Sequence, residues 1–206
     1  MPAAIEVMES RILPIYLNAA QKSRSMTTPK VARKAADKPT AQGEPMLPRA
    51  QWRDVLREVT LEVFSTMTGI TLTFPAPSDE AAPAPASADA SLSPHVTGMI
   101  GIAGAMRAVF SLRCSDRAAI TIASQMLMIS LEEAAAQKCD AIGEVSNMIA
   151  GHFKRKIGSG SSCTLTVPTV VVGGNYTIHC LEKGERLEFP VTCEGESLLV
   201  TLDIRS

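Results

Sequence analysis

The amino-acid sequence predicts an α+β fold in which two long antiparallel helices pack on a mostly antiparallel sheet. Two runs of apolar residues with helical spacing, one starting at Trp52 and one within residues 131–157, are each followed by strand-like stretches. Eight residues of the first run also resemble eight of the second. Together these observations predict a duplicated helix-plus-strands unit.

The chain has 206 residues, of which 46% are hydrophobic. That is enough for one domain of about 150 residues with extensions. Residues 1–50 are rich in Ala, Lys, Pro and Thr and lack periodicity, so we expect a disordered N-terminal extension and a domain over residues 51–206. A partner-binding helix within residues 5–17, or a true start at Met26 or Met46, are alternatives.

Charge and cysteine usage exclude several classes of function. A net charge of −1 does not suit nucleic-acid binding. No apolar stretch approaches the roughly 20 residues needed to cross a bilayer, so no membrane insertion is expected. The 5 cysteines form an odd set without CxxC spacing, which favours free thiols in the cytoplasm, and the histidines are too scattered to predict a metal site.

In the first half, the helix from Trp52 is expected to end at Gly69, and residues 70–74 can form a short strand. The Pro/Ala-rich segment 75–94 is expected to be an insertion that does not pack in a core. After it come paired strands over residues 96–103 and 106–112.

A helix follows over residues 116–129, with Asp116 as its N-cap. The second half begins with the helix over residues 131–157. Its expected strands cover residues 164–172, 176–180, 187–193 and 198–204.

The second long helix carries the candidate site. At about 100° per residue, Asp140, Glu144, Asn147 and Gly151 share one face. The opposite face is apolar, which favours its burial in a core. Such polar residues are most often only the solvated face of a helix. Asn is, however, a poor helix-interior residue, because its amide competes for backbone hydrogen bonds, and Gly143 and Gly151 add to the loss of helix stability.

The internal repeat aligns Glu62-Val-Phe-Ser65-Thr-Met-Thr-Gly69 with Glu144-Val-Ser-Asn147-Met-Ile-Ala-Gly151, although coincidence over eight residues is an alternative. Ser65 takes the place of Asn147. A serine hydroxyl cannot present a donor and an acceptor side by side, as the carboxamide of an asparagine does. The first half is therefore expected to be inactive, which leaves one site rather than two.

Residues 140–151, reading Asp-Ala-Ile-Gly-Glu-Val-Ser-Asn-Met-Ile-Ala-Gly, together with Thr166-Val-Pro-Thr-Val-Val-Val-Gly-Gly174, resemble the CheX branch of the CheC/CheX/FliY chemotaxis phosphatases. The resemblance covers roughly residues 52–204. It implies a Glu-x-x-Asn site, which maps to Glu144 and Asn147 as catalytic residues. The CheX branch carries one such site, which fits the presence of Ser65 rather than an asparagine at the equivalent position of the first half.

The resemblance further implies hydrolysis of the aspartyl phosphate on a CheY-type receiver domain. Asn147 would orient the attacking water and Glu144 would pair with the receiver lysine. The chain itself would hold no cofactor, since the receiver supplies Mg²⁺. A homodimer formed through an edge strand within residues 176–204 is also implied. The alternative is a receiver-binding or flagellar-switch-type module that does not catalyse hydrolysis.

Overall fold

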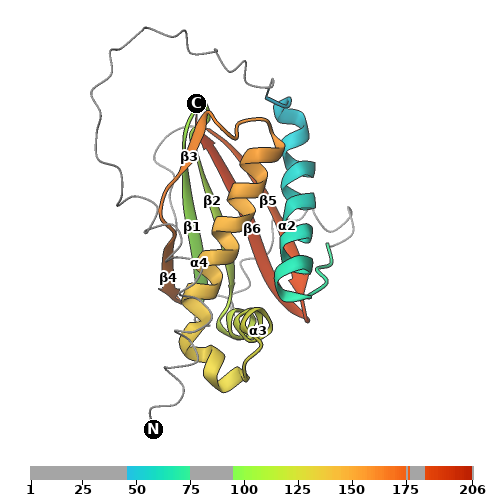
Figure 1. The fold of residues 1–206 in the computed structure, drawn as a ribbon, viewed down its shortest axis with the longest axis vertical. Coiled ribbons are helices and arrows are strands. Elements are labelled where there is room, and N and C mark those ends of the chain that lie inside the picture. The colour runs from blue at the N-terminus through green and yellow to red at the C-terminus, as the bar shows by residue number, and fades with distance from the viewer. Residues whose placement is uncertain (1–45, 75–94, 175, 177–183, 206) are drawn as a thin grey trace, which may run out of the picture. The chain divides into compact units, whose positions relative to one another are not determined.

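The computed structural model describes residues 46–74, 95–174, 176 and 184–205 (Figure 1). All of them belong to one compact unit, Gln42–Ser206. The extension expected at the N-terminus, up to residue 45, and the insertion at 75–94 lie outside the described residues. So does the strand expected at 176–180, apart from Tyr176, which is not in a strand.

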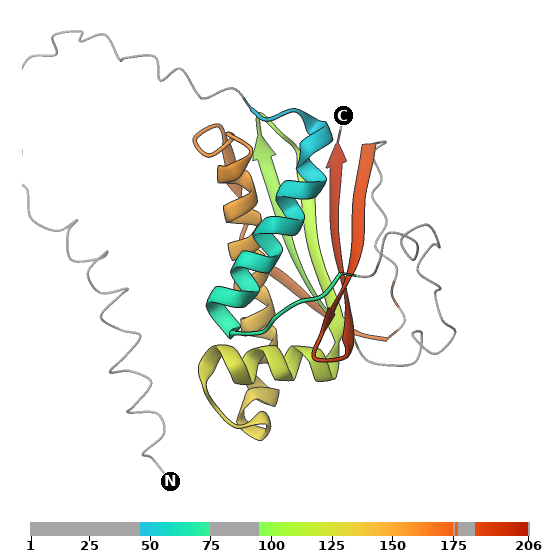
Figure 2. The same ribbon diagram turned by 90° about the vertical axis from the view of Figure 1, so that its right-hand side faces the viewer.

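The described residues form three α-helices that pack on an antiparallel sheet, as predicted (Figures 1 and 2). A 3₁₀ turn, η2 (Arg49–Gln51), leads into the first helix. The helices are α2 (Trp52–Thr68), α3 (Asp116–Leu127) and α4 (Leu131–Lys156). The strands are β1 (His95–Gly104), β2 (Ala108–Ser115), β3 (Cys163–Leu165), β4 (Thr169–Gly173), β5 (Gly184–Cys193) and β6 (Glu196–Arg205). The sheet order is β3-β1-β2-β6-β5, and β4 also pairs with β1.

The two long helices are antiparallel. The start of α2 lies at the end of α4, where the Trp52 and Phe153 rings meet edge to face at 5.9 Å. Just before α2, the Leu47 backbone N–H donates to the Ile157 carbonyl at 2.9 Å, and the Trp52 indole donates to the Leu47 carbonyl at 2.9 Å. Residues before position 51 therefore take part in the described fold.

The topology repeats, as the internal repeat of eight residues predicted. Each half contains a long helix, a short extended segment and two long strands. The short segment pairs with the other half: β4 pairs with β1, and Thr73 forms a bridge with Thr192 of β5. β2 and β6 meet at the centre. The strand expected at residues 70–74 is reduced to that one bridge.

The helix ends follow local signals. α2 stops at Gly69, which has a φ of 68° that favours glycine, as predicted. For α3, the prediction of Asp116 as N-cap is wrong, because the Ser115 hydroxyl accepts the Ala118 N–H at 3.1 Å. Asp116 instead accepts a bond from Lys138 at 2.6 Å. α4 begins with a capping box between Ser130 and Glu133.

The prediction of one continuous strand over residues 164–172 is wrong, because the structure has two strands there, β3 and β4. Leu165 pairs with Ile102 and Thr169 pairs with Met99, so three residues, Thr166–Pro168, lie opposite two residues of β1. One extra residue on one strand is a β-bulge. Pro168, which has no N–H to donate to a ladder, lies within it.

The sheet face that packs against the helices contains an unusually close approach. A Cβ added to Gly98 of β1 would lie 2.3 Å from the Ser146 Oγ and 3.0 Å from the Ile142 carbonyl oxygen of α4. Ser146 is fully buried, and its hydroxyl donates to the Ile142 carbonyl at 2.7 Å. α4 can therefore lie against β1 only where both residues are small.

Three of the described cysteines, Cys114, Cys163 and Cys193, belong to the core. Burial raises the pKa of the Cys114 thiol to about 12 and that of the Cys193 thiol to about 11. Cys139 on α4 is half-buried. Because the thiolate is the reactive form, Cys114 and Cys193 are poor nucleophiles in the folded protein.

We predict that Gly98→Ala lowers the free energy of unfolding by about 1–3 kcal/mol, because the new methyl group overlaps Ser146. Urea denaturation measures this. Gly160→Ala is the matched control, since its Cβ would have 3.8 Å of room, and it should change stability by no more than about 1 kcal/mol. Adding Ser146→Ala to Gly98→Ala should restore part of the loss. Equal stability of Gly98→Ala and wild type would contradict the close approach.

We also predict that an alkylating reagent at about pH 8 modifies Cys139 but neither Cys114 nor Cys193 in the native protein. At a pKa of about 12, only about one Cys114 thiol in ten thousand is ionised at that pH. All three should react after denaturation. Peptide mass mapping provides the measurement, and rapid native labelling of Cys114 would contradict its burial.

Candidate functional site

The α4 helix presents the predicted site residues as its amphipathic pattern indicated. Ile142, Val145, Ile149 and Phe153 are fully buried. On the opposite side, Asp140 and Glu144 are exposed, whereas Asn147 and Gly151 are half-buried. The capping box, the buried stripe and the contact with β1 all hold this helix, so Glu144 and Asn147 stand on a rigid element.

Glu144 and Asn147 are available to another molecule. Among the described residues, neither side chain has a hydrogen-bond or ion-pair partner. They are three residues apart on one helical face, so their side chains are neighbours. The arrangement offers one carboxylate and one amide side by side. An amide can donate and accept hydrogen bonds but cannot take up a proton as a base at neutral pH.

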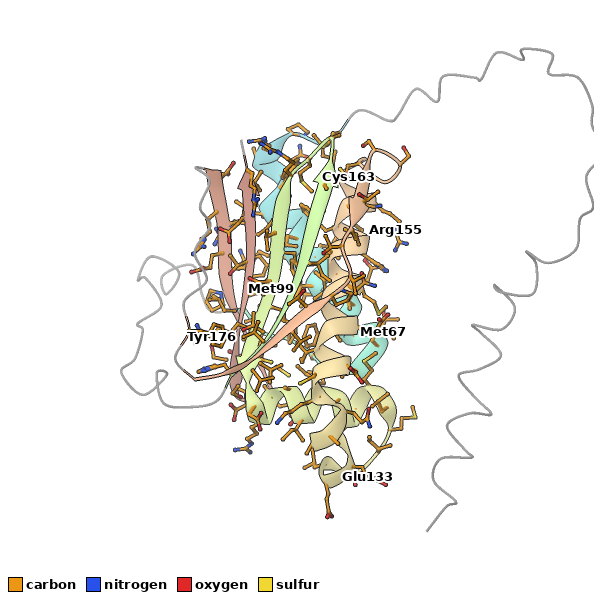
Figure 3. All side chains as sticks on the ribbon, turned by 90° about the vertical axis from the view of Figure 1, so that its left-hand side faces the viewer. Met67, Met99, Glu133, Arg155, Cys163 and Tyr176 are labelled. Atoms are coloured by element: carbon orange, nitrogen blue, oxygen red, sulfur yellow. The ribbon has the colours of Figure 1, made fainter. Side chains whose placement is uncertain are left out.

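The segment from β3 to β4 forms one side of the site. Figure 3 shows it running beside α4, from Cys163 near the C-terminal end of the helix towards Tyr176. A Cβ on Gly151 would lie 3.8 Å from Leu165 Cδ1, and one on Gly143 would lie 3.3 Å from Val170 Cγ2. Lys154 donates to the Cys163 carbonyl at 2.7 Å and ties the same segment to the helix.

This side of the site was missed by reasoning from sequence. In the structure Leu165 lies next to Gly151, and Gly143 similarly admits the bulge residue Pro168 at 3.5 Å. Pro168 within an otherwise strand-like stretch was the one signal that could have predicted a break there.

The equivalent face of α2 differs from that of α4. Ser65 and Glu62 are exposed there, as the internal repeat implies. Lys156, at the end of α4, forms ion pairs with Glu58 at 2.9 Å and with Glu62 at 3.2 Å. The hydrogen bond to Glu58, supported by Glu62, raises the pKa of Lys156. The carboxylate equivalent to Glu144 is therefore already paired.

Within the described residues, no group of three or more His, Cys, Asp or Glu side chains could hold a metal ion. No helix in that part of the chain is both long and apolar enough to span a bilayer.

Several solved structures share this fold. CheX from Desulfovibrio desulfuricans has a TM-score of 0.60 and 21% identity, and the match covers 75% of this chain and 99% of that chain. CheX from Vibrio vulnificus has a TM-score of 0.59 and 24% identity over 77% of this chain and 99% of that one.

The CheX in a CheX–CheY–BeF₃–Mg²⁺ complex from Borrelia burgdorferi has a TM-score of 0.56 and 17% identity, over 77% of this chain and 100% of that chain. No curated protein sequence matches the chain.

A family comparison adds to the shared fold. Residues 96–192, which run from β1 into β5 and include all of α4, match the family model described as chemotaxis phosphatase CheX. The predicted resemblance to the CheC/CheX/FliY group is therefore confirmed, and the chain is CheX-like both in its family pattern and in its fold.

Proposed function

We propose that this chain is a phosphatase that hydrolyses the aspartyl phosphate of a CheY-type receiver domain. The observation that carries the proposal is the pair Glu144 and Asn147, which is outward-facing and unpaired within the described residues. The pair lies in the region matched by the chemotaxis phosphatase model. The CheX of Borrelia burgdorferi, whose fold is similar, forms a complex with a CheY in the presence of BeF₃ and Mg²⁺.

The proposed chemistry asks little of the phosphatase. Water attacks phosphorus, the bond to the aspartyl oxygen breaks, and the carboxylate leaves while the water proton passes to solvent or phosphate. An acyl phosphate already has a good leaving group. The receiver would supply Mg²⁺ and a lysine to neutralise the phosphoryl charge, so the phosphatase has to place one water molecule in line.

Asn147 suits this placement. Its amide can accept a hydrogen bond from the water with its oxygen and donate to a phosphoryl oxygen with its nitrogen. It acts by orienting the water rather than by removing its proton. The half-buried position of Asn147 on a packed helix limits its rotamers, which favours a fixed geometry.

Glu144 is assigned to docking. One helical turn from Asn147 and exposed, it can pair with the receiver lysine and set the register in which the phosphoryl group meets the amide. On α2, Glu62 is occupied by Lys156 and Ser65 lacks an amide, so we assign that face no catalytic role.

We also propose a homodimer formed through a sheet edge. The β5 edge is partly closed, because Thr192 exchanges hydrogen bonds of 2.8 and 3.0 Å with Thr73. Two residues earlier, Pro190 has no N–H to offer on that edge, and the Glu188 carbonyl accepts from Arg53 at 3.0 Å. Pairing along β5 would therefore be confined to its first residues, Gly184–Leu187.

We predict that wild-type protein accelerates phosphate loss from a phosphorylated CheY-type receiver of the same organism, and that Asn147→Ala lowers the catalysed rate by about a hundredfold or more. Glu144→Gln should mainly raise KM. Ser65→Ala on the equivalent face of α2 is the matched control and should behave as wild type. Phosphate release is followed in parallel with receiver alone.

If Asn147→Ala is as fast as wild type, the role given to Asn147 is wrong. If wild-type protein binds the receiver without accelerating phosphate loss, the protein is an interaction module and the phosphatase proposal fails.

We predict a sedimentation mass near twice the chain mass of 21.9 kDa at micromolar concentration. A mass equal to one chain at that concentration would rule out the homodimer.

A further inference from the structure

Val167 has an aliphatic side chain that is exposed to solvent. It is 83% exposed, although valine is usually buried. It stands in the middle of the bulge, where Thr166–Pro168 oppose only Ile100 and Gly101 of β1. Bulges occur often beside active sites, where the extra residue re-aims a side chain.

The bulge is firmly held to the sheet. The Thr166 backbone N–H donates to the Gly101 carbonyl at 2.9 Å, and the Gly101 N–H donates to the Thr166 hydroxyl at 2.9 Å. A Cβ on Gly101 would lie 2.8 Å from Thr166 Cγ2, so a larger residue at this position would force the Thr166 side chain to shift. Val167 is therefore presented in a fixed position, which reduces the entropy that a partner must remove on binding.

Contacts between the bulge and α4 fix the position of Val167 along the helix axis. Leu165, two residues before it, lies next to Gly151, and Pro168, just after it, lies next to Gly143. Asn147 is four residues from each glycine, so it occupies the same side of the helix midway between them. The bulge thus passes α4 at the level of Asn147.

A second exposed valine extends this surface. Val172 of β4 is 50% exposed and points to the same side of its strand as Val170, which lies next to Gly143. Val172 is therefore a second exposed valine on the segment that runs beside α4. A protein whose phosphoryl group reaches Asn147 therefore approaches the bulge that carries Val167.

We propose that Val167 is a docking residue for the phosphorylated receiver, an inference that rests on the proposed function. It contacts an apolar part of the receiver surface beside the phosphorylation site. Because that contact is the same in the ground state and the transition state, it changes KM and leaves kcat unaltered, unlike Asn147.

The test compares the steady-state kinetics of Val167→Asp with those of Met128→Asp, using the phosphorylated receiver as substrate. Met128 is the matched control: it is 93% exposed and precedes α4, whose first residue, Leu131, lies about 24 Å along the helix axis from Asn147. We expect Val167→Asp to raise KM about tenfold with kcat within about twofold of wild type. Met128→Asp should match wild type, and the conservative Val167→Ile should keep a low KM.

An unchanged KM for Val167→Asp would overturn the proposal, as would an equal rise for Met128→Asp or a loss confined to kcat. Thermal melting checks that each variant is folded. If wild-type protein does not hydrolyse the phosphate, the proposed function fails by itself, and binding to a beryllofluoride-activated receiver then decides the case. An about tenfold weaker Kd for Val167→Asp would support the docking role, and equal Kd values would reject it.

Discussion

The structure depends on the close approach of α4 to β1 at Gly98 and Ser146. A methyl group on Gly98 would sit 2.3 Å from the Ser146 hydroxyl oxygen, so any larger residue separates helix and sheet. Ser146 can be buried there because its hydroxyl bonds to the Ile142 carbonyl of its own helix. The contact sets both the height and the rotation of α4 on the sheet, and therefore which face is left to solvent.

That rotation brings the rest of the site together. With Ser146 against β1, Gly143 meets β4 and the bulge, Asn147 lies one turn further along the same side of α4, and Glu144 stays exposed. The helix and the bulge are both tied to β1, one through packing and the other through hydrogen bonds with Gly101. The polar pair and the bulge with Val167 thus share one support, and a change at β1 would move them together.

The duplicated topology yields two helices in equivalent places with unequal chemistry. α4 continues beyond Gly151, the position equivalent to the Gly69 that ends α2, and this extension carries Lys156 to Glu58 and Glu62. One carboxylate of the repeat is neutralised within the chain, and the other remains open. The ion pairs are surface pairs that add little stability, so their main effect is to occupy Glu62.

The sequence by itself determined the features that depend on neighbours along the chain: the apolar stripe of α4, the exposed Glu144, and the end of α2 at Gly69. It could not determine which of two adjacent polar residues caps α3, since Ser115 and Asp116 both suit an N-cap and Asp116 pairs with Lys138 from another helix.

Only the tertiary structure decided that Val167 stands at the level of Asn147. That depends on the register of β3 and β4 against β1, more than sixty residues away in sequence, and one extra residue in that register turns a strand residue outward.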